Sequence, residues 1–159
     1  MNDFILAIDA GTTSSRAIIF DRNGTTIGSS QHEFTQHFPK ESWVEHDALE
    51  IWDTQLFAIK EVLEKTNIKA NQIHAMGITN QRETTVIWNR STGKPVHNAI
   101  VWQDRRTAFI CDKLKKSGKA SVFYEKTGLL LDAYFSGTKI KWILDQDPEL
   151  KKQALNGEL

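Results

Sequence analysis

The sequence has little cysteine, no surplus of either charge and no long apolar run, and each scarcity excludes a class of protein. Its single cysteine, Cys111, cannot build a disulfide framework or a zinc site, which favours a reducing compartment and a cytoplasmic location. The 20 basic and 20 acidic residues cancel, so no nucleic-acid partner is expected. No apolar stretch approaches the roughly 20 residues of a membrane span, and the N-terminus has no signal-peptide pattern. Small molecules are therefore the expected partners.

What is present is the composition of a folded domain. Hydrophobic residues make up 40% of the 159 residues and charged residues 25%, which is the balance of a globular protein with a core. Cys111 falls in step with Ala108 and Leu114 on a predicted helix, so we expect a small buried side chain there. The histidines show no metal-ligand spacing.

The beginning of the chain predicts an antiparallel meander of three strands. Apolar runs over residues 4–10 and 16–21 are typical of strands, and a weaker alternation continues over 25–34. The second and third runs are separated by Asn23-Gly24, a pair favoured in tight hairpin turns.

A polar loop and a helix are expected next. Residues 35–46 are mostly polar and contain Pro39, so we interpret them as a loop. Asp47, followed three residues later by Glu50, indicates a helix that begins with a capping box. Apolar residues at spacings of three and four predict the face of this helix in the core: Leu49, Trp52, Leu56, Ile59 and Leu63.

The rest of the chain alternates short strands and helices. The expected strands are 73–79, 84–88 and about 99–102, with a hairpin turn over 89–93. The expected helices are 105–116, 121–126, 138–145 and a last one that Asp147 caps, with Pro148 at its first position. A meander followed by alternating elements predicts an α/β protein with a mixed sheet flanked by helices. The chain ends without a closing element, which suggests a fragment.

The turn between the first two strands, Asp9 to Arg16, is a candidate phosphate site. Gly11 allows close approach of the backbone to a ligand, and successive N–H groups in a tight turn can bind an anion. A carboxylate beside a phosphate is explained by magnesium, which takes one or two carboxylates together with substrate phosphates. The cationic fork of Arg16 suits phosphate oxygens unless it lies back on the sheet. The turn alone is explained as well by an ordinary polar hairpin, because the usual phosphate motifs are absent.

Longer stretches make the interpretation specific. The sequence resembles the glycerol kinases of the FGGY family of carbohydrate kinases in DAGTTSSRAIIFD (9–21), SWVEHDALEIW (42–52), GITNQRETTVIWNRSTGKPVHNAIVWQDRRT (77–107) and KTGLLLDAYFSGTKIKWILD (126–145). The resemblance runs over nearly the whole chain. It implies a ribonuclease H-like (actin-like ATPase) fold, with residues 1–159 forming the first, incomplete part of the N-terminal domain of a longer protein with two such domains.

The resemblance also implies roles for individual residues. Four residues match positions that contact the nucleotide phosphates, namely Thr12, Thr13, Ser14 and Arg16. Asp9 matches a carboxylate associated with hydrated magnesium. Three residues match positions that contact glycerol, namely Arg82, Glu83 and Tyr134, and Trp102 matches the aromatic wall beside it.

The whole protein implied by this family is a homo-oligomer that uses ATP and Mg²⁺ to phosphorylate glycerol. Its general base is an Asp well downstream, so the 159-residue chain alone is expected to be inactive. Ala10 departs from the family, which commonly has Gln at that position of the turn.

The chemistry of glycerol suits the matched residues. Glu83 can accept hydrogen bonds from two hydroxyl groups, and Arg82 can donate several. Neighbouring residues in a strand point to opposite faces, so a turn or bulge at Gln81–Glu83 is required if both side chains face one ligand. Trp102 could cover the carbon edge of glycerol, and Tyr134 could bind a remaining hydroxyl.

Other interpretations stay open at this point. Without the resemblance, each of these residues taken singly is more typical of a surface ion pair or a core aromatic than of a binding site. Arg105-Arg106 fits either a solvated helix start or a subunit contact. The function could also be that of another FGGY kinase, acting on a longer polyol or a ketose, or of a non-enzymatic nucleotide-binding module like actin or the heat-shock chaperones.

Overall fold

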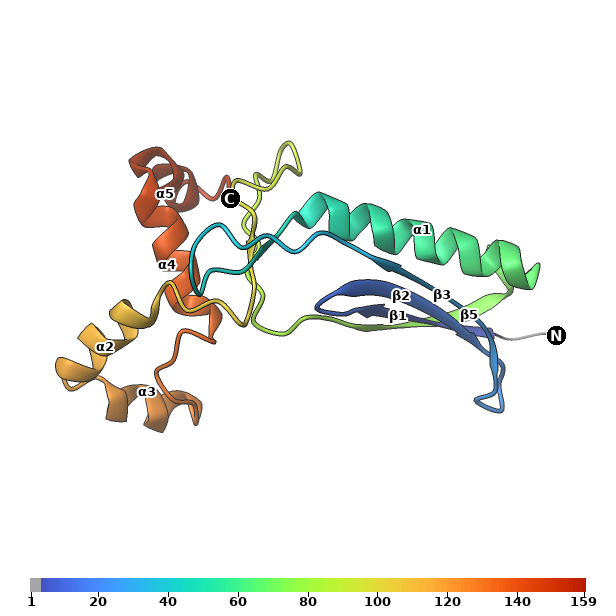
Figure 1. Ribbon diagram of the computed structural model, residues 1–159, viewed down its shortest axis with the longest axis horizontal. Coiled ribbons are helices and arrows are strands. Elements are labelled where there is room, and N and C mark those ends of the chain that lie inside the picture. Colours follow the sequence, from blue (N-terminus) through green and yellow to red (C-terminus); the bar gives the residue numbers. More distant parts are fainter. Residues whose placement is uncertain (1–3) are drawn as a thin grey trace. The chain divides into compact units, whose positions relative to one another are not determined.

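The predicted meander forms three of the four strands of a mixed sheet (Figure 1). Strand β1 (Phe4–Ala10) pairs antiparallel with β2 (Ser14–Phe20), which pairs antiparallel with β3 (Thr26–Glu33). Strand β5 (Ile73–Thr79) lies on the other side of β1 and runs parallel to it, which gives the order β3-β2-β1-β5. The computed structural model describes residues 4–159, and the meander and the mixed sheet are confirmed.

The described residues form two units that each combine two stretches of the chain. The first unit contains the sheet and is made of residues up to 36 together with 47–81. The second is made of 37–46 and 82–159.

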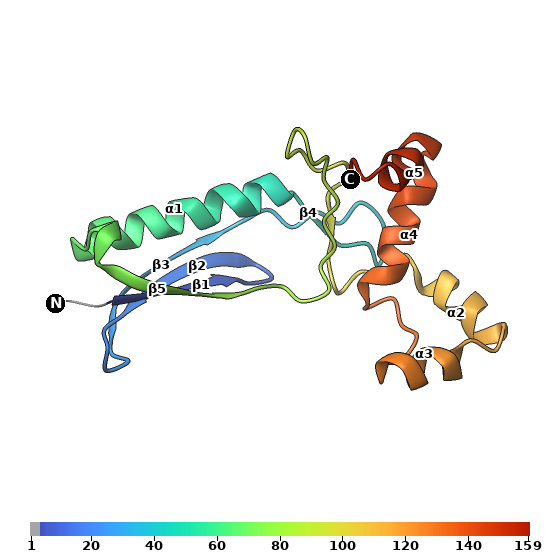
Figure 2. The same ribbon diagram turned by 180° about the vertical axis from the view of Figure 1, so that it is seen from behind.

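One face of the sheet is covered by helix α1 (Ala48–Thr66) (Figure 2). Asp47 caps the helix, because its Oδ1 accepts a hydrogen bond of 2.8 Å from Leu49 N. The capping box is not closed as predicted, since the Oε1 of Glu50 accepts instead from the backbone N (3.0 Å) and Oγ1 (2.9 Å) of Thr35. A single-turn 3-10 helix, Ala70–Gln72, leads from the helix toward β5.

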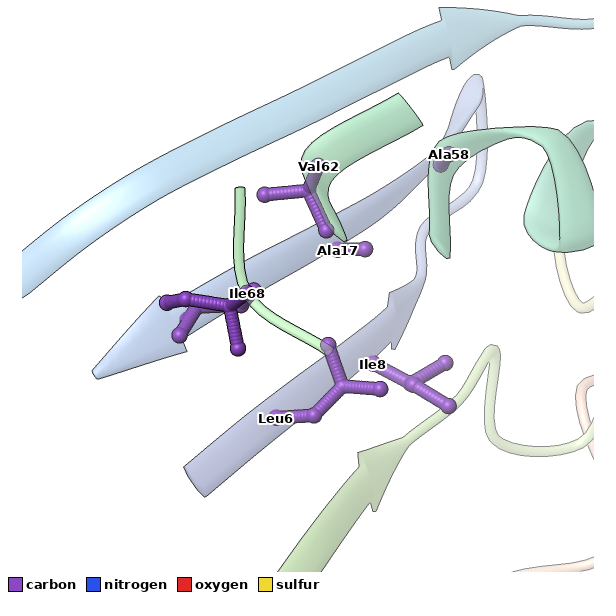
Figure 3. Packing of buried hydrophobic residues seen from close by; sticks show 7 residues of the cluster. Leu6, Ile8, Ala17, Ala58, Val62 and Ile68 are labelled. Atoms are coloured by element: carbon purple, nitrogen blue, oxygen red, sulfur yellow. The ribbon is translucent and has the colours of Figure 1, made fainter. Parts of the chain in front are cut away.

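The core between α1 and the sheet consists of small and branched side chains (Figure 3). Its buried members are Leu6, Ile8, Ala17, Ile19, Ala58, Val62 and Ile68. The predicted helix face was wrong for Leu49 and Trp52, which are 49% and 61% exposed, whereas Ile59 and Leu63 pack at the edge of the core.

The buried line of α1 is Gln55, Ala58 and Val62. Ala58 and Val62 are small enough to let the helix approach the sheet closely, and Gln55 Nε2 donates to the backbone oxygen of Arg16 at 3.0 Å. At Gly28 of β3, an added Cβ would stand 2.4 Å from the Cγ2 of Thr66, so the glycine is needed for this approach.

The second unit is mainly helical. The predicted helices are confirmed as α2 (Ala108–Lys116), α3 (Ala120–Thr127), α4 (Ser136–Gln146) and α5 (Pro148–Leu155), with α2 beginning three residues later than expected. Asp147 caps α5 through Glu149 N (2.8 Å), with Pro148 in the first turn as predicted. Cys111 is buried in α2 as expected, and burial raises the pKa of its thiol.

The loops of this unit are connected by one short strand pair and by isolated β-bridges. The polar segment predicted as a loop contains strand β4 (Glu45–His46), which pairs antiparallel with β6 (Ala99–Ile100). The strand predicted over 84–88 is wrong, because only isolated bridges form there, from Thr85 to Ile100 and from Trp88 to Pro95. The turn over 89–93 is confirmed, with Asn89 Oδ1 accepting hydrogen bonds at its tip.

Among residues 4–159, no helix combines the length and the apolar character needed to cross a membrane.

Candidate functional site

The turn between β1 and β2 is closed by its own backbone. Gly11 N donates to Ser14 O at 2.9 Å, and a Cβ at position 11 would stand 3.0 Å from that same oxygen. The close approach therefore favours a glycine. Thr13 at the tip is exposed, Thr12 is half-buried, and Ser14 is 8% exposed.

A row of polar side chains crosses the sheet just behind this turn. Asp9 on β1 lies opposite Arg16 on β2, which lies opposite Gln31 on β3, and residues that pair directly share a face. Arg16 Nε donates to Gln31 Oε1 (2.9 Å), and Gln31 Nε2 donates to Ser14 Oγ (2.9 Å). Two of the predicted phosphate residues are thus tied to Gln31, which the sequence analysis missed and which the register of the meander could have identified.

The residues of the turn fit a hydrated magnesium ion but not a protein-enclosed metal. Residues 4–159 contain no group of three or more His, Cys, Asp or Glu side chains that could hold a metal. Asp9 stands half-buried at the carboxyl end of β1, beside Thr79 at the end of the parallel strand β5. A single carboxylate suits magnesium, which keeps several waters and takes its remaining ligands from substrate phosphates.

Glu83, in the second unit, lies in the tight turn that the sequence predicted. Its φ is +67°, the left-handed region that non-glycine residues rarely adopt. The neighbouring Arg82 is exposed, whereas Glu83 is half-buried. The expected break of the strand at Gln81–Glu83 is therefore confirmed.

The Glu83 carboxylate is bound at the beginning of α4. Its Oε2 accepts hydrogen bonds from the backbone N (2.9 Å) and Oγ (2.8 Å) of Ser136. The N-terminus of a helix favours a negative charge, so the site is electrostatically suited to a carboxylate. Both of these hydrogen bonds go to one carboxylate oxygen, Oε2.

Trp102 and Tyr134 meet edge to face. Their ring centroids are 5.9 Å apart at an interplanar angle of 67°. Trp102 N donates to the Oγ1 of Thr84, the residue after Glu83 (3.3 Å). Lys139 of α4 donates to the backbone oxygens of both Glu83 (2.9 Å) and Tyr134 (2.8 Å). The second unit thus brings three of its predicted residues together, and sequence reasoning missed both residues of α4 that connect them.

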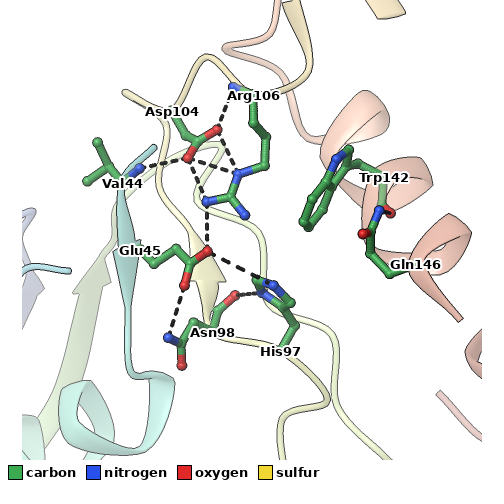
Figure 4. A network of polar contacts seen from close by, with 8 residues as sticks. All are labelled: Val44, Glu45, His97, Asn98, Asp104, Arg106, Trp142 and Gln146. Carbon is green, nitrogen blue, oxygen red and sulfur yellow. Dashed lines mark hydrogen bonds and ion pairs between the residues drawn. The ribbon is translucent and has the colours of Figure 1, made fainter. Parts of the chain in front are cut away.

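Arg106 stands in a buried ionic network (Figure 4). Its Nη2 lies 2.8 Å from both Asp104 Oδ2 and Glu45 Oε1, and its guanidinium lies over the rings of Trp43 (3.9 Å) and Trp142 (4.8 Å). The side chain is fully buried, so neither interpretation of this arginine was right: it is an internal charge.

The neighbouring Arg105 is half-exposed and pairs with Asp132 at 2.6 Å. This hydrogen-bonded pair lowers the pKa of Asp132.

A cavity of about 480 Å³ lies beside Glu83 and Ser136 and is lined otherwise mainly by apolar side chains of the segment from α2 to α4. Arg82, Trp102 and Tyr134 do not line it, so it is not the polar enclosure that a triol requires.

Comparison with known proteins defines the class and then the family. Over 99% of this chain, the fold is that of the Plasmodium falciparum glycerol kinase crystallised with ADP, with a TM-score of 0.91, 32% identity and coverage of 31% of that chain. The fold is thus that of the sugar kinases of the actin-like ATPase class. Residues 4–156 match the model of the FGGY family of carbohydrate kinases, N-terminal domain. The chain belongs to this family.

Curated relatives are similar over the whole chain. The glycerol kinase of Rhizobium meliloti (strain 1021) is 61% identical over 159 residues, which are 100% of this chain and 32% of that protein. The glycerol kinase of Borreliella burgdorferi (strain ZS7) is 62% identical over 156 residues, which are 98% of this chain and 31% of that protein. The chain therefore spans about a third of the length of these relatives.

Proposed function

We propose that this chain is the N-terminal segment of an ATP-dependent glycerol kinase, which converts ATP and glycerol into ADP and glycerol 3-phosphate. The observation that carries the proposal is the identity of about 60% to glycerol kinases over the full chain. The nucleotide is supported by the ADP in the Plasmodium falciparum crystal structure.

The second unit supplies the proposed contacts to glycerol. Glu83 Oε1 accepts from a glycerol hydroxyl while Oε2 stays bound to Ser136. The Tyr134 phenol binds another hydroxyl, the Trp102 ring covers the carbon edge, and Arg82 donates from its exposed position. A site built to hydrogen-bond hydroxyl groups discriminates strongly against analogues that lack them.

The turn of the first unit supplies the proposed contacts to the nucleotide phosphates. Thr12 and Thr13 offer backbone and hydroxyl donors, Ser14 adds its hydroxyl, and the guanidinium of Arg16 is held in place by Gln31. Asp9 would hold magnesium through water. The bound ion would neutralise charge on the phosphate oxygens during transfer.

The proposal is tested by Glu83→Ala in the full-length protein. Loss of a hydrogen bond to a charged acceptor raises the KM for glycerol by about tenfold to a hundredfold, with the KM for ATP little changed. A coupled ADP-release assay with each substrate varied separately measures both constants. Glu125→Ala, at an exposed position of α3, is the matched control. Equal losses for both substrates would make Glu83 a structural residue.

The chain alone is expected to lack kinase activity. We assign the general base, an Asp by resemblance to the family, to a segment outside these 159 residues, and the same assay on the purified chain checks this. Glycerol-dependent ADP release by the chain would contradict the assignment.

The alternative is an FGGY kinase that acts on a longer polyol or a ketose instead of glycerol. A panel of substrates assayed with the full-length protein distinguishes the two. Glycerol is favoured because the relatives at about 60% identity are glycerol kinases.

For the whole protein we also infer a cytoplasmic homo-oligomer, which follows from the resemblance and from a composition with one buried thiol. Size-exclusion chromatography with light scattering tests the assembly.

A further inference from the structure

We propose that Lys139 and Ser136 are positioning residues, which hold Glu83 and Tyr134 in the geometry that binds glycerol. The inference rests on the proposed function. It assigns to the first turn of α4 the role of holding the residues that contact glycerol, without a contact of its own to glycerol.

Lys139 joins two distant points of the chain. Its side chain is fully buried, and its Nζ donates at 2.9 Å to the backbone oxygen of Glu83 and at 2.8 Å to that of Tyr134. An ammonium group has three N–H donors, so one lysine can donate to two carbonyl oxygens at the same time. The backbones of the two proposed glycerol contacts are thereby bound to one atom.

Ser136 binds the side chain of the same glutamate. The serine N and Oγ bind the Glu83 carboxylate, while Lys139 binds the Glu83 carbonyl. Main chain and side chain of Glu83 are thus both fixed by one helical turn. Tyr134 lies two residues before this helix, so the same rigid element carries it.

The arrangement is costly for the protein, which argues against a role in packing alone. Lysine is rarely fully buried, and burial lowers the pKa of Lys139 to about 8, while Asp104, Glu83 and Asp132 oppose this shift and Arg106 adds to it. Glu83 itself has a left-handed backbone. Conformations of this kind persist where the surroundings fix them, and they cluster at functional sites.

Neither residue is assigned a contact with glycerol. Lys139 is enclosed by protein, and the hydroxyl of Ser136 is directed to Glu83. Their effect on catalysis must therefore pass through the placement of Glu83 and Tyr134, which affects the affinity for glycerol and leaves the nucleotide contacts alone.

The experiment compares Lys139→Met and Ser136→Ala with the wild type in the full-length protein. We expect each variant to raise the KM for glycerol by about tenfold, the effect of one lost hydrogen bond of this strength, with the KM for ATP within about twofold. Lys141→Met is the matched control, because it removes the same charge from an exposed position of the same helix. We expect it to leave both constants unchanged.

The outcomes separate this inference from the proposed function. If wild-type protein shows no glycerol-dependent ADP release, the proposed function fails and the inference with it. If the wild type is active and the variants keep the wild-type KM for glycerol, or lose ATP and glycerol affinity equally, the inference alone is overturned. Should Lys139→Met not fold, Ser136→Ala decides, since it removes one hydroxyl and keeps the backbone donor.

Discussion

Position 83 carries a backbone that glycine would adopt more easily than glutamate. With φ at +67°, any side chain with a Cβ costs roughly 1–2 kcal/mol there. The residue is kept despite this cost because its carboxylate has partners on α4, as the hydrogen bonds to Ser136 show. Strain and the proposed binding role are therefore combined in one residue.

This combination gives a prediction for two variants that lose the same carboxylate. Glu83→Gly relieves the backbone and Glu83→Ala does not, so we expect the glycine variant to be more stable than the alanine variant by about 1 kcal/mol, after the greater chain entropy of unfolded glycine is subtracted. Urea unfolding of the chain measures the difference. An alanine variant of equal or greater stability would show that the backbone at 83 is relaxed.

Glu61 makes the stability of the first unit sensitive to acid. Its carboxylate accepts hydrogen bonds from Ser30, Lys65 and His32, in decreasing order of effect, and these lower its pKa from 4.5 to about 2. Because the folded pKa lies below the unfolded one, the stabilisation is complete above pH 4.5 and disappears as the pH falls toward about 2.

The corresponding prediction concerns Glu61→Gln. We expect the wild type to exceed this variant in free energy of unfolding at neutral pH, and the difference to shrink through the acid range given by those two pKa values. Urea titrations at a series of pH values give the curve. A difference that stays constant down to the lowest pH would contradict the assignment.

At the scale of elements, the beginning of α1 depends on one side chain. Asp47 caps Leu49 N, and Glu50 cannot take over because Thr35 occupies its carboxylate. We expect Asp47→Ala to lower the free energy of unfolding by about 1 kcal/mol. Asp53→Ala, at an exposed position of the same helix, is the control for loss of an acidic group. Equal losses in urea unfolding would deny Asp47 its capping role.

Local signals predicted most elements of this fold. The apolar run of β1, the Asn-Gly turn, the cap at Asp47 and the Asp147-Pro148 pair each specify their own element, and all are found. Local signals failed at two segments whose structure depends on remote partners. Strand β4 has two residues and exists because Ala99–Ile100 pairs with it, whereas the β-branched segment 84–88 finds only isolated bridges.

In the candidate site, too, the local turn was predictable and the remote contacts to it were not. The turn at Glu83 was predicted from the family resemblance, which gives Arg82 and Glu83 one ligand, together with the rule that neighbours in a strand face opposite ways. Ser136 and Lys139 could not be predicted, because each acts through a contact with Glu83, which is far away in the sequence. In the sequence, Lys139 is an ordinary helical lysine, and only its burial distinguishes it.

At the scale of the whole molecule, Arg106 connects the two stretches of the second unit. It pairs with Asp104 on one stretch and with Glu45 on the other, in a fully buried position. Removing one partner of a buried ionic group leaves uncompensated charge and typically costs about 3–5 kcal/mol.

We therefore expect Arg106→Met to lower the free energy of unfolding of the chain by about 3–5 kcal/mol. Arg105→Met is the adjacent control, since its pair with Asp132 is partly exposed and is worth about 1 kcal/mol or less. Urea unfolding with tryptophan fluorescence suits the measurement, because Trp43 and Trp142 both contact Arg106. Similar losses for the two variants would contradict the role of the network.

The interleaving of the two units has a consequence for how such genes can be recombined. Residues 37–46 belong with 82–159, yet 47–81 lies between them in the chain. A single crossover between related genes anywhere in 47–81 would join the Glu45 of one parent to the Arg106 of the other. A chimera whose parents differ at Glu45 or at Arg106 would therefore lose this buried ion pair.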